Sequence, residues 1–276
     1  MAQANNITTT INKLTNLELS IQISLSGLSF CILQRDTQTI TDLKVIPFKK
    51  KLNPIALLDK LKEAFETETA LQNKFYAVNV IHDNELSTLV PQSIFNENNL
   101  ADYLKFNSKI LKSDFITFDT IDLNQSVNVY IPYVNVNNYI YDHFGDFTFK
   151  HASTVLIETI LATEKTSETT QFYAHVGQNQ FQIIVLKNGK LQFYNSFVFH
   201  TKEDFIYYIL FTAEQLKASP ESLNLLLLGD VKQDDELYNI AYKYIRNVSF
   251  GQAQKQYKFT ETPETNHSNF TLINGF

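Results

Sequence analysis

Apolar and polar residues alternate in two runs that flank Asn188-Gly189, within the stretch from Phe172 to Phe199 (FYAHVGQNQFQIIVLKNGKLQFYNSFVF). Asn-Gly between two such runs is a strong signal for a β-hairpin, because both residues tolerate the positive φ angles of a tight turn. A third alternating run, 172–176, precedes the hairpin across the polar segment 177–180. The pattern therefore predicts three consecutive antiparallel strands.

A helix over 201–218 is predicted directly after these strands. Thr201 and Asp204 have the spacing of a capping box, in which each side chain binds the other residue's backbone N–H. The residues that recur at helical spacing and mark its buried face are Phe205, Ile209 and Leu216.

The same order of elements is predicted near the start of the chain. Alternation over 17–24 predicts a strand, Ser26-Gly27 a turn, and the runs 28–34 and 39–48 two further strands. A helix begins at Asn53-Pro54, because Asn caps a helix and Pro at the first helical position sacrifices no hydrogen bond. One plan of three strands and a helix is thus expected twice.

The rest of the chain predicts further strands and helices around these two repeats. Strands are expected at 75–81, 87–90, 115–121, 127–133, 147–149, 223–228 and 270–273, and helices at 98–107, 136–144, 151–162 and 237–245. The expected domain organisation is a flexible leader at 1–16, a first half at 17–150 with an insert at 127–149, and a second half at 151–276.

The composition is that of a globular protein with a slight excess of acid. Hydrophobic residues make up 44% and charged residues 19% of the 276 residues, and the net charge is -6. Because the only basic run is 49–51, phosphate neutralisation is disfavoured and we expect no nucleic-acid binding. No apolar run approaches the roughly 18 residues of a membrane span, and the N-terminus lacks the regions of a signal peptide. We expect a cytoplasmic protein without membrane insertion.

Common catalytic and metal-binding motifs are missing from the sequence. It contains no GxxxxGK[ST], no GxSxG and no GxGxxG. The single cysteine, Cys31, lies in an apolar strand, where a buried and inert thiol is expected. Apart from His175, the histidines lack the paired spacing of a zinc site and are expected to lie at the surface or in hydrogen bonds. They are His82, His143, His151, His200 and His267.

The repeated order of three strands, a helix and further strand–helix units resembles the superfamily of actin, hexokinase and Hsp70. The run 127–162 (VNVYIPYVNVNNYIYDHFGDFTFKHASTVLIETILA) is similar to the insert of its pilus-assembly branch, the PilM- and GspL-like proteins. The stretches 87–95 (STLVPQSIF) and 101–107 (ADYLKFN) resemble an uncharacterised bacterial family of unknown function with this fold. The resemblance extends over about residues 17–250. It implies an α/β fold of duplicated actin-like (ribonuclease H-like) βββαβα halves around a cleft.

The resemblance also places three motifs of the active members on this chain. In those members each half has a hairpin that cradles phosphates and an acidic strand end that holds Mg²⁺. The first acidic position falls on Gln22 and the glycine after it on Ser24. The second acidic position falls on His175, with Gly177 retained. The third motif, a glycine pair that lets an adenine ring approach, falls on Gly229-Asp230, where one glycine is kept.

These departures favour a pseudo-enzyme, because Gln brings no negative charge to a metal and His is a poor Mg²⁺ ligand. The first hypothesis is a non-catalytic actin-like adaptor or assembly scaffold that binds a protein partner and uses no cofactor or metal. The alternative is an ATP-binding ATPase or kinase with Mg²⁺ and atypical phosphate-site residues. Its nucleotide site would comprise Gln22, Ser24, Ser26, Gly27, His175, Gly177, Gly229 and Asp230. A small-molecule binder that uses the cleft without nucleotide stays open as a third hypothesis.

Three aspartates flank the predicted strand 115–121, near the position where sugar-kinase members of the superfamily keep a catalytic base. They are Asp114, Asp119 and Asp122. A strand end with solvated aspartates is the simpler interpretation.

Overall fold

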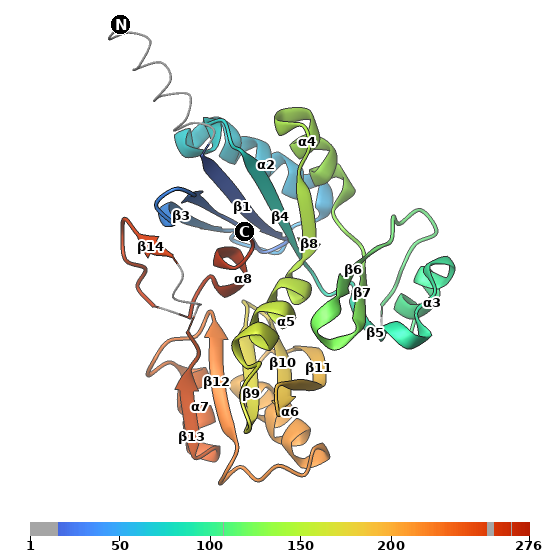
Figure 1. Cartoon of the computed structure of the whole chain (residues 1–276), viewed down its shortest axis with the longest axis vertical. Helices are drawn as coiled ribbons and strands as arrows, with labels where there is room; N and C mark the ends of the chain where they lie inside the picture. The colour runs from blue at the N-terminus through green and yellow to red at the C-terminus, as the bar shows by residue number, and fades with distance from the viewer. Residues whose placement is uncertain (1–15, 107, 253–256, 266) are drawn as a thin grey trace, which may run out of the picture.

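The computed structural model describes residues 16–106, 108–252, 257–265 and 267–276 (Figure 1). Apart from Asn16, the leader expected at 1–16 lies outside the described residues. Two large sheets lie one above the other in Figure 1, and each contains a three-stranded antiparallel meander continued by parallel strands. This duplicated arrangement confirms the predicted α/β fold class.

The first sheet is formed mainly by the N-terminal part of the chain. Its strands are β1 (Leu17–Ser24), β2 (Gly27–Gln34), β3 (Thr39–Pro47), β4 (Ala77–Asp83), β8 (Thr148–His151) and β14 (Lys258–Phe259). They lie in the order β14-β3-β2-β1-β4-β8. β1 pairs antiparallel with β2 and parallel with β4, so the ends of β1 and β4 meet at one edge of the sheet.

Two helices cover the outer face of this sheet, α2 (Pro54–Thr67) and α4 (Val134–Phe144). The Asn53 side chain caps α2 by accepting a hydrogen bond from the Ala56 backbone N–H at 2.9 Å, as predicted. Burial of apolar side chains of both helices against β1 makes this layer the core of the first half. The helix core residues are Leu57, Leu61, Phe65, Val136 and Ile140.

The second sheet repeats the arrangement. Its strands are β9 (Thr170–Val176), β10 (Gln180–Lys187), β11 (Lys190–Val198), β12 (Asn224–Gly229) and β13 (Asn247–Phe250), in the order β11-β10-β9-β12-β13. The predicted Asn188-Gly189 turn joins β10 to β11, with φ angles of 52° and 68°. Helices α6 (Lys202–Gln215) and α7 (Glu236–Tyr244) cover its outer face, and the predicted Thr201–Asp204 capping box begins α6.

Helix α5 (Ala152–Thr163) lies between the two sheets (Figure 1). Nine of its twelve residues are buried. Leu156, Ile157 and Ile160 pack against the second sheet, whereas Ala152 and Val155 contact Ile81 of β4. The helix is apolar nearly all round but too short to cross a membrane, and no other helix of the described residues is long and apolar enough to do so.

A small third sheet projects to the side of the first half in Figure 1. It contains β5 (Ser87–Pro91), β6 (Thr117–Ile121) and β7 (Ser126–Tyr130) in the order β5-β7-β6, and α3 (Leu100–Leu104) packs against it. Its strands were predicted as separate elements, but their pairing into one sheet was not. Short 3₁₀ segments at Thr69–Gln72, Gln92–Ile94, Glu97–Asn99 and Asp122–Asn124 complete the connections.

After β13 the chain returns to the first half. β14 pairs with β3, and α8 (Phe270–Ile273) lies against β1 and β2, where the Ser20 hydroxyl donates a hydrogen bond to the Leu272 carbonyl oxygen at 2.9 Å. The predicted strand near 270–273 is therefore wrong. A four-residue run that is buried on all sides has the same apolar pattern in a strand and in a helix, so periodicity cannot separate them. The proposed division of the chain at residue 150 stays a prediction.

Replacing Leu272 by alanine tests whether α8 is part of the folded core. Leu272 is 0% exposed, so Leu272→Ala leaves a cavity and should lower the free energy of unfolding by about 3 kcal/mol. Leu123→Ala is the matched control, because Leu123 is 57% exposed and its truncation should change stability by less than about 0.5 kcal/mol. Urea denaturation followed by circular dichroism measures both, and equal effects would contradict the docking of α8.

Candidate functional site

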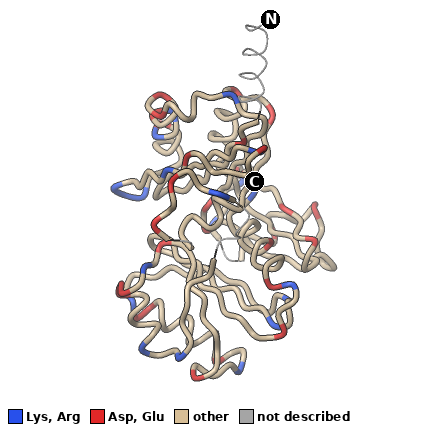
Figure 2. The backbone as a smooth tube through the Cα atoms, turned by 60° about the vertical axis from the view of Figure 1, so that its left-hand side comes forward, with Lys and Arg blue, Asp and Glu red and all other residues tan. Residues whose placement is uncertain are grey.

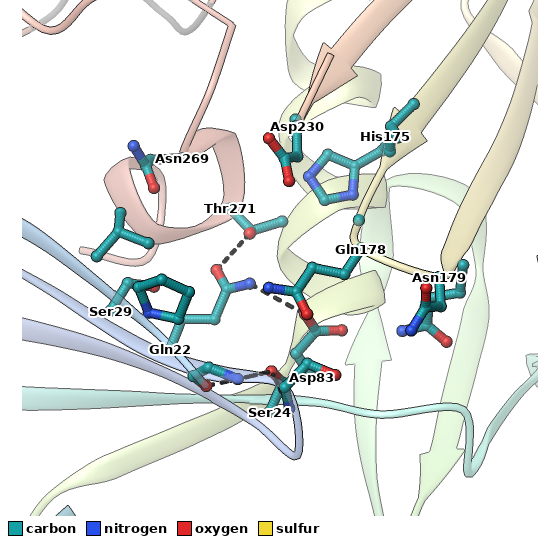
Figure 3. Close-up of a pocket in the computed structure, with 18 of the residues that line it drawn as sticks. Gln22, Ser24, Ser29, Asp83, His175, Gln178, Asn179, Asp230, Asn269 and Thr271 are labelled. Atoms are coloured by element: carbon teal, nitrogen blue, oxygen red, sulfur yellow. Dashed lines mark hydrogen bonds between the residues drawn. The ribbon is translucent and has the colours of Figure 1, made fainter. Parts of the chain in front are cut away.

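A pocket of about 520 Å³ opens between the β1–β2 hairpin of the first half and the β9–β10 hairpin of the second (Figure 3). All the residues that the sequence placed in a nucleotide site line it: Gln22, Ser24, Ser26, Gly27, His175, Gly177, Gly229 and Asp230. The volume lies within the range of pockets that bind small molecules or side chains. The fold thus brings these residues together, and their role stays a prediction.

In the first hairpin, the turn residues are hydrogen-bonded to one another. The Ser24 hydroxyl accepts from the backbone N–H of Ser26 at 3.2 Å and from that of Gly27 at 3.0 Å. The same hydroxyl donates to the Gly27 carbonyl oxygen at 3.1 Å. The two N–H groups that would hold a phosphate are therefore already satisfied within the turn.

The Gln22 side chain connects three segments at the floor of the pocket (Figure 3). Its Nε2 donates to Asp83 Oδ2 at 3.2 Å, and its Oε1 accepts from the Thr271 hydroxyl at 2.6 Å. Asp83 ends β4 and Thr271 lies in α8, so the amide links β1 to both elements. A carboxylate at position 22 would replace this donor by a second negative charge beside Asp83.

Asp83 is one of the pocket residues that the sequence interpretation missed. β1 and β4 are parallel and in register, with Ser24 opposite Asp83, so both strands end at the pocket. A predicted strand at 75–81 followed closely by an aspartate was the available signal, because the ends of neighbouring parallel strands share one edge of a sheet. Using that signal requires knowing that the two strands are neighbours, which the local pattern does not show.

Asp83 and His175 form an electrostatically linked pair across the pocket. Burial raises the pKa of Asp83, while His175 and the hydrogen bond from Gln22 act in the opposite direction. Burial also lowers the pKa of His175, against the hydrogen bond to Gln182 (Nδ1 to Oε1, 2.8 Å) and the attraction of Asp83. Both shifts favour the neutral forms, so His175 is not a permanent cation in this pocket.

At the turn after β12, the backbone itself requires a glycine. Gly229 has a φ of +83°, and an added Cβ would lie 2.2 Å from the carbonyl oxygen of Val176. The Asp230 N–H donates to that same oxygen at 2.8 Å. His267 fixes the turn from the other side, since its carbonyl oxygen accepts from the Gly229 N–H at 2.9 Å and its ring stacks on Phe250. Gly229 is thus explained by chain packing without any ligand.

The lysines that line the pocket are paired with glutamates. Lys51 Nζ lies 3.0 Å from Glu85 Oε1, and Lys232 Nζ lies 2.8 Å from Glu264 Oε2. Asp83 and Asp230 also line the pocket, and within the described residues neither forms a salt bridge. The same part of the chain contains no group of three or more His, Cys, Asp or Glu side chains placed to hold a metal ion.

Behind the pocket, His82 of β4 lies in register with His151 of β8. His82 Nδ1 accepts from the Tyr133 backbone N–H at 3.3 Å, and its Nε2 bonds Asn137 Oδ1 at 2.9 Å. These partners require a neutral ring with the proton on Nε2. Burial lowers the pKa of His82 to about 4, against the hydrogen bond to Asn137.

His151 has the same arrangement at the start of α5. Its Nδ1 accepts from the Ser153 backbone N–H at 3.1 Å, which caps the helix, and its Nε2 bonds the Asn84 carbonyl oxygen at 3.1 Å. Burial lowers the pKa of His151 to about 3, and the nearby His82 adds to the effect. The two histidines of this layer are buried hydrogen-bonding groups, so the expectation of structural histidines holds for both.

Asp119 belongs to this buried layer and is not a solvated strand end. Its Oδ2 accepts from the His151 backbone N–H at 2.9 Å and from the Thr154 hydroxyl at 2.7 Å, and its Oδ1 accepts from the Tyr130 hydroxyl at 3.0 Å. The carboxylate therefore fixes the N-terminus of α5 to the third sheet. With these partners it does not line the pocket and cannot act there as a base.

Two duplicated sheets that face each other across a pocket between their hairpins define an actin-like fold. A protein of Bacteroides thetaiotaomicron described as having an actin-like ATPase fold and unknown function is similar, with a TM-score of 0.78 and 24% identity over 87% of this chain and 92% of that chain. The PilM–PilN type IV pilus biogenesis complex is similar with a TM-score of 0.61 and 11% identity, over 94% of this chain and 96% of that chain.

The match at the level of families is more specific. Residues 6–248 match a family described as protein of unknown function (DUF3822), and the chain belongs to this family. No curated protein matches the sequence. The resemblance to the actin-like superfamily, to PilM-like proteins and to a family of unknown function is thereby confirmed.

Lowering the pH should destabilise the protein through His82 and His151. Both have pKa values below the 6.5 of an exposed histidine, so between pH 6.5 and about 4 the unfolded chain binds protons that the native state does not. Their stabilisation is complete above pH 6.5 and is lost as the pH falls, by about 2 kcal/mol for each ring at pH 5. Urea denaturation at several pH values measures this loss.

His82→Asn separates this effect from other titrations, because asparagine keeps an oxygen that can accept from the Tyr133 N–H. The variant should show a pH dependence shallower by about 2 kcal/mol between pH 7 and pH 5. His200→Asn, at an exposed position, serves as the control and should leave the slope unchanged. Parallel curves for wild type and His82→Asn would contradict the assignment.

Replacing Gly229 by alanine should cost about 3 kcal/mol of unfolding free energy or more, because strain at positive φ adds to the overlap with Val176. Gly145→Ala is the matched comparison, since Gly145 also has a positive φ, +78°, but nothing lies within 4 Å of the added Cβ. Its loss should therefore be clearly smaller. The denaturant midpoints of the two variants measure this difference, provided that the slopes of their unfolding transitions are equal. An equal loss of unfolding free energy in both variants would rule out the overlap with Val176 as the cause.

Proposed function

We propose that the protein is a non-catalytic member of the actin-like fold that works as an adaptor or assembly scaffold and binds a protein partner. The observation that carries this proposal is the first hairpin, whose N–H groups at Ser26 and Gly27 are bound by the Ser24 hydroxyl. A phosphate would have to displace these bonds, and Gln22 beside them offers no charge to a metal.

The charge of the pocket supports the proposal as well. A nucleoside triphosphate needs cations around its phosphates, from Mg²⁺ or from Lys and Arg side chains. Lys51 and Lys232 are each paired with a glutamate, and Asp230 adds a further negative charge. The side chains that line the pocket would therefore repel the ligand that the active superfamily members bind.

A protein partner is supported by the neighbour and by the charge distribution. The PilM-like neighbour is part of a complex with a second pilus-biogenesis protein, and it has this fold over nearly the whole chain. Lys and Arg are interspersed with Asp and Glu along the backbone (Figure 2), an arrangement that does not favour a nucleic acid as the partner.

One observation favours the alternative of a nucleotide-binding ATPase or kinase. The pocket is open and has a volume of about 520 Å³, so side chains do not fill the space between Gln22, His175 and Gly229. Steric exclusion therefore does not decide between the two functions. The chemistry of the side chains that line the pocket has to decide between them.

Mg-ATP should neither stabilise the purified protein nor release phosphate. A ligand that binds only the folded state at about 100 times its Kd would add about 2.7 kcal/mol of stability, which thermal unfolding detects easily. We expect the melting temperature with millimolar Mg-ATP to equal that with Mg²⁺ alone, and phosphate release to equal that of buffer.

A rise in the melting temperature with Mg-ATP would overturn the proposal and favour the alternative. In that case Gly177→Val should abolish the rise, because Gly177 lies in the second hairpin at the pocket wall. Asn195→Val introduces a valine at an exposed position of β11 and is the control. This variant should keep the rise in melting temperature.

A further inference from the structure

The wall of the pocket carries two aspartates that form no salt bridge with a basic side chain of the described residues. Its acidic side chains are Asp83, Glu85, Asp230 and Glu264, and its basic ones are Lys51 and Lys232. Both lysines are bound to glutamates at 3.0 and 2.8 Å, which leaves the two aspartates. Asp83 is the deeper of the two, because it lies at the end of β4 whereas Asp230 is exposed.

The groups around Asp83 supply no permanent positive charge. Gln22 donates one hydrogen bond to Oδ2 at 3.2 Å but carries no charge itself. His175 faces Asp83, yet burial lowers its pKa and favours the neutral ring. Burial raises the pKa of Asp83 and favours its protonated form, whereas an adjacent cation favours the carboxylate, so a cation bound in the pocket would stabilise the ionised form of Asp83.

Further hydrogen-bond acceptors surround the same space. The amide side chains of Gln178, Asn179 and Asn269 line the pocket together with Asp83 (Figure 3). Their carbonyl oxygens accept hydrogen bonds without adding charge. A guanidinium group has five N–H donors in a planar fork and no acceptor, so it matches a pocket lined by a carboxyl group and several amide oxygens.

Part of the pocket wall is apolar and lies on β3 of the first half and on the edge strand β11 of the second. Val45 of β3 is 53% exposed and Val198 of β11 is 55% exposed, and both line the pocket, as does Pro47. A free amine would bind the floor and leave these valines in water. A polypeptide segment with apolar residues beside a basic one would cover both regions.

We propose that this pocket binds a basic side chain, with an arginine guanidinium as the best match, from an extended segment of the partner protein, with Asp83 as its counter-charge and Val45 and Val198 contacting the apolar neighbours. This inference rests on the proposed function, because it names the chemistry of the partner at that site. It assigns the pocket to a cation, whereas the alternative function requires a polyanion there.

The test uses the synthetic peptide Ac-Ala-Val-Arg-Val-Ala-amide and the same peptide with citrulline in place of arginine. Citrulline has nearly the same shape but no charge. Isothermal titration calorimetry at low salt should show binding of the arginine peptide and at least about tenfold weaker binding of the citrulline peptide. Binding of the arginine peptide should weaken as salt is added. Equal binding of the two peptides, or no binding of the arginine peptide at millimolar concentration, would overturn the inference.

Variants locate the contact. Asp83→Asn keeps an oxygen that accepts from Gln22 and should weaken the arginine peptide at least about tenfold. Asp142→Asn, on the exposed face of α4, makes the same chemical change far from the pocket and should have no effect. If Asp83→Asn does not fold, the exposed Asp230→Asn replaces it and should weaken binding about threefold. An unchanged affinity in the folded pocket variant would place the peptide elsewhere and overturn the assignment.

Spermidine distinguishes a partner segment from a small polycation. Tighter binding of spermidine than of the arginine peptide would overturn the assignment to a polypeptide, and weaker binding supports it. These negative results can be distinguished from a failure of the proposed function, because that failure would appear as binding of Mg-ATP. A negative peptide result without ATP binding would leave the non-catalytic adaptor standing with a different docking site.

Discussion

The hydrogen bonds of one neutral amide determine what the pocket can hold. Gln22 donates to Asp83 and accepts from Thr271, and so joins β1, β4 and α8 at the point where the two halves meet. Only a group with both a donor and an acceptor can make these two bonds, and an aspartate or glutamate at position 22 could not donate to a second carboxylate. In an active relative, a bound metal ion would offset the repulsion between two such carboxylates. Here the Gln22 amide forms two hydrogen bonds at this point, so the identity of residue 22 and the position of Asp83 are linked.

In the first hairpin, too, a side chain of the protein itself satisfies backbone hydrogen-bond donors. Where a glycine would leave backbone N–H groups free for phosphate, Ser24 supplies a hydroxyl that binds those of Ser26 and Gly27. Buried or half-buried donors without partners are costly, so these bonds stabilise the hairpin without a ligand. Gln22 and Ser24 thus satisfy the polar groups at this edge of the pocket by contacts within the chain.

Local signals were sufficient to predict most of the fold from the sequence. Asn188-Gly189, Asn53-Pro54 and the Thr201–Asp204 box each act through neighbours a few residues away, and all three occur as predicted. The helix at 270–273 and the position of Asp83 were not predictable in this way. Both depend on contacts across the whole chain, such as the Ser20–Leu272 bond and the β1–β4 register, and a run of four residues is too short to show a periodicity. The pocket residues were found through the repeat, which fixes where each hairpin ends.

A retained glycine is weak support for a retained ligand. Gly229 looks like the remainder of a nucleotide motif, yet its φ of +83° and the 2.2 Å approach to Val176 would require glycine in an empty pocket as well. Since β12 has to turn away from β9 at this point, the fold keeps the residue whatever the pocket binds. Side chains that the backbone does not constrain, such as Asp83 and Asp230, are therefore better indicators of the ligand. Neither carboxyl group offers a positive charge to a phosphate in either protonation state.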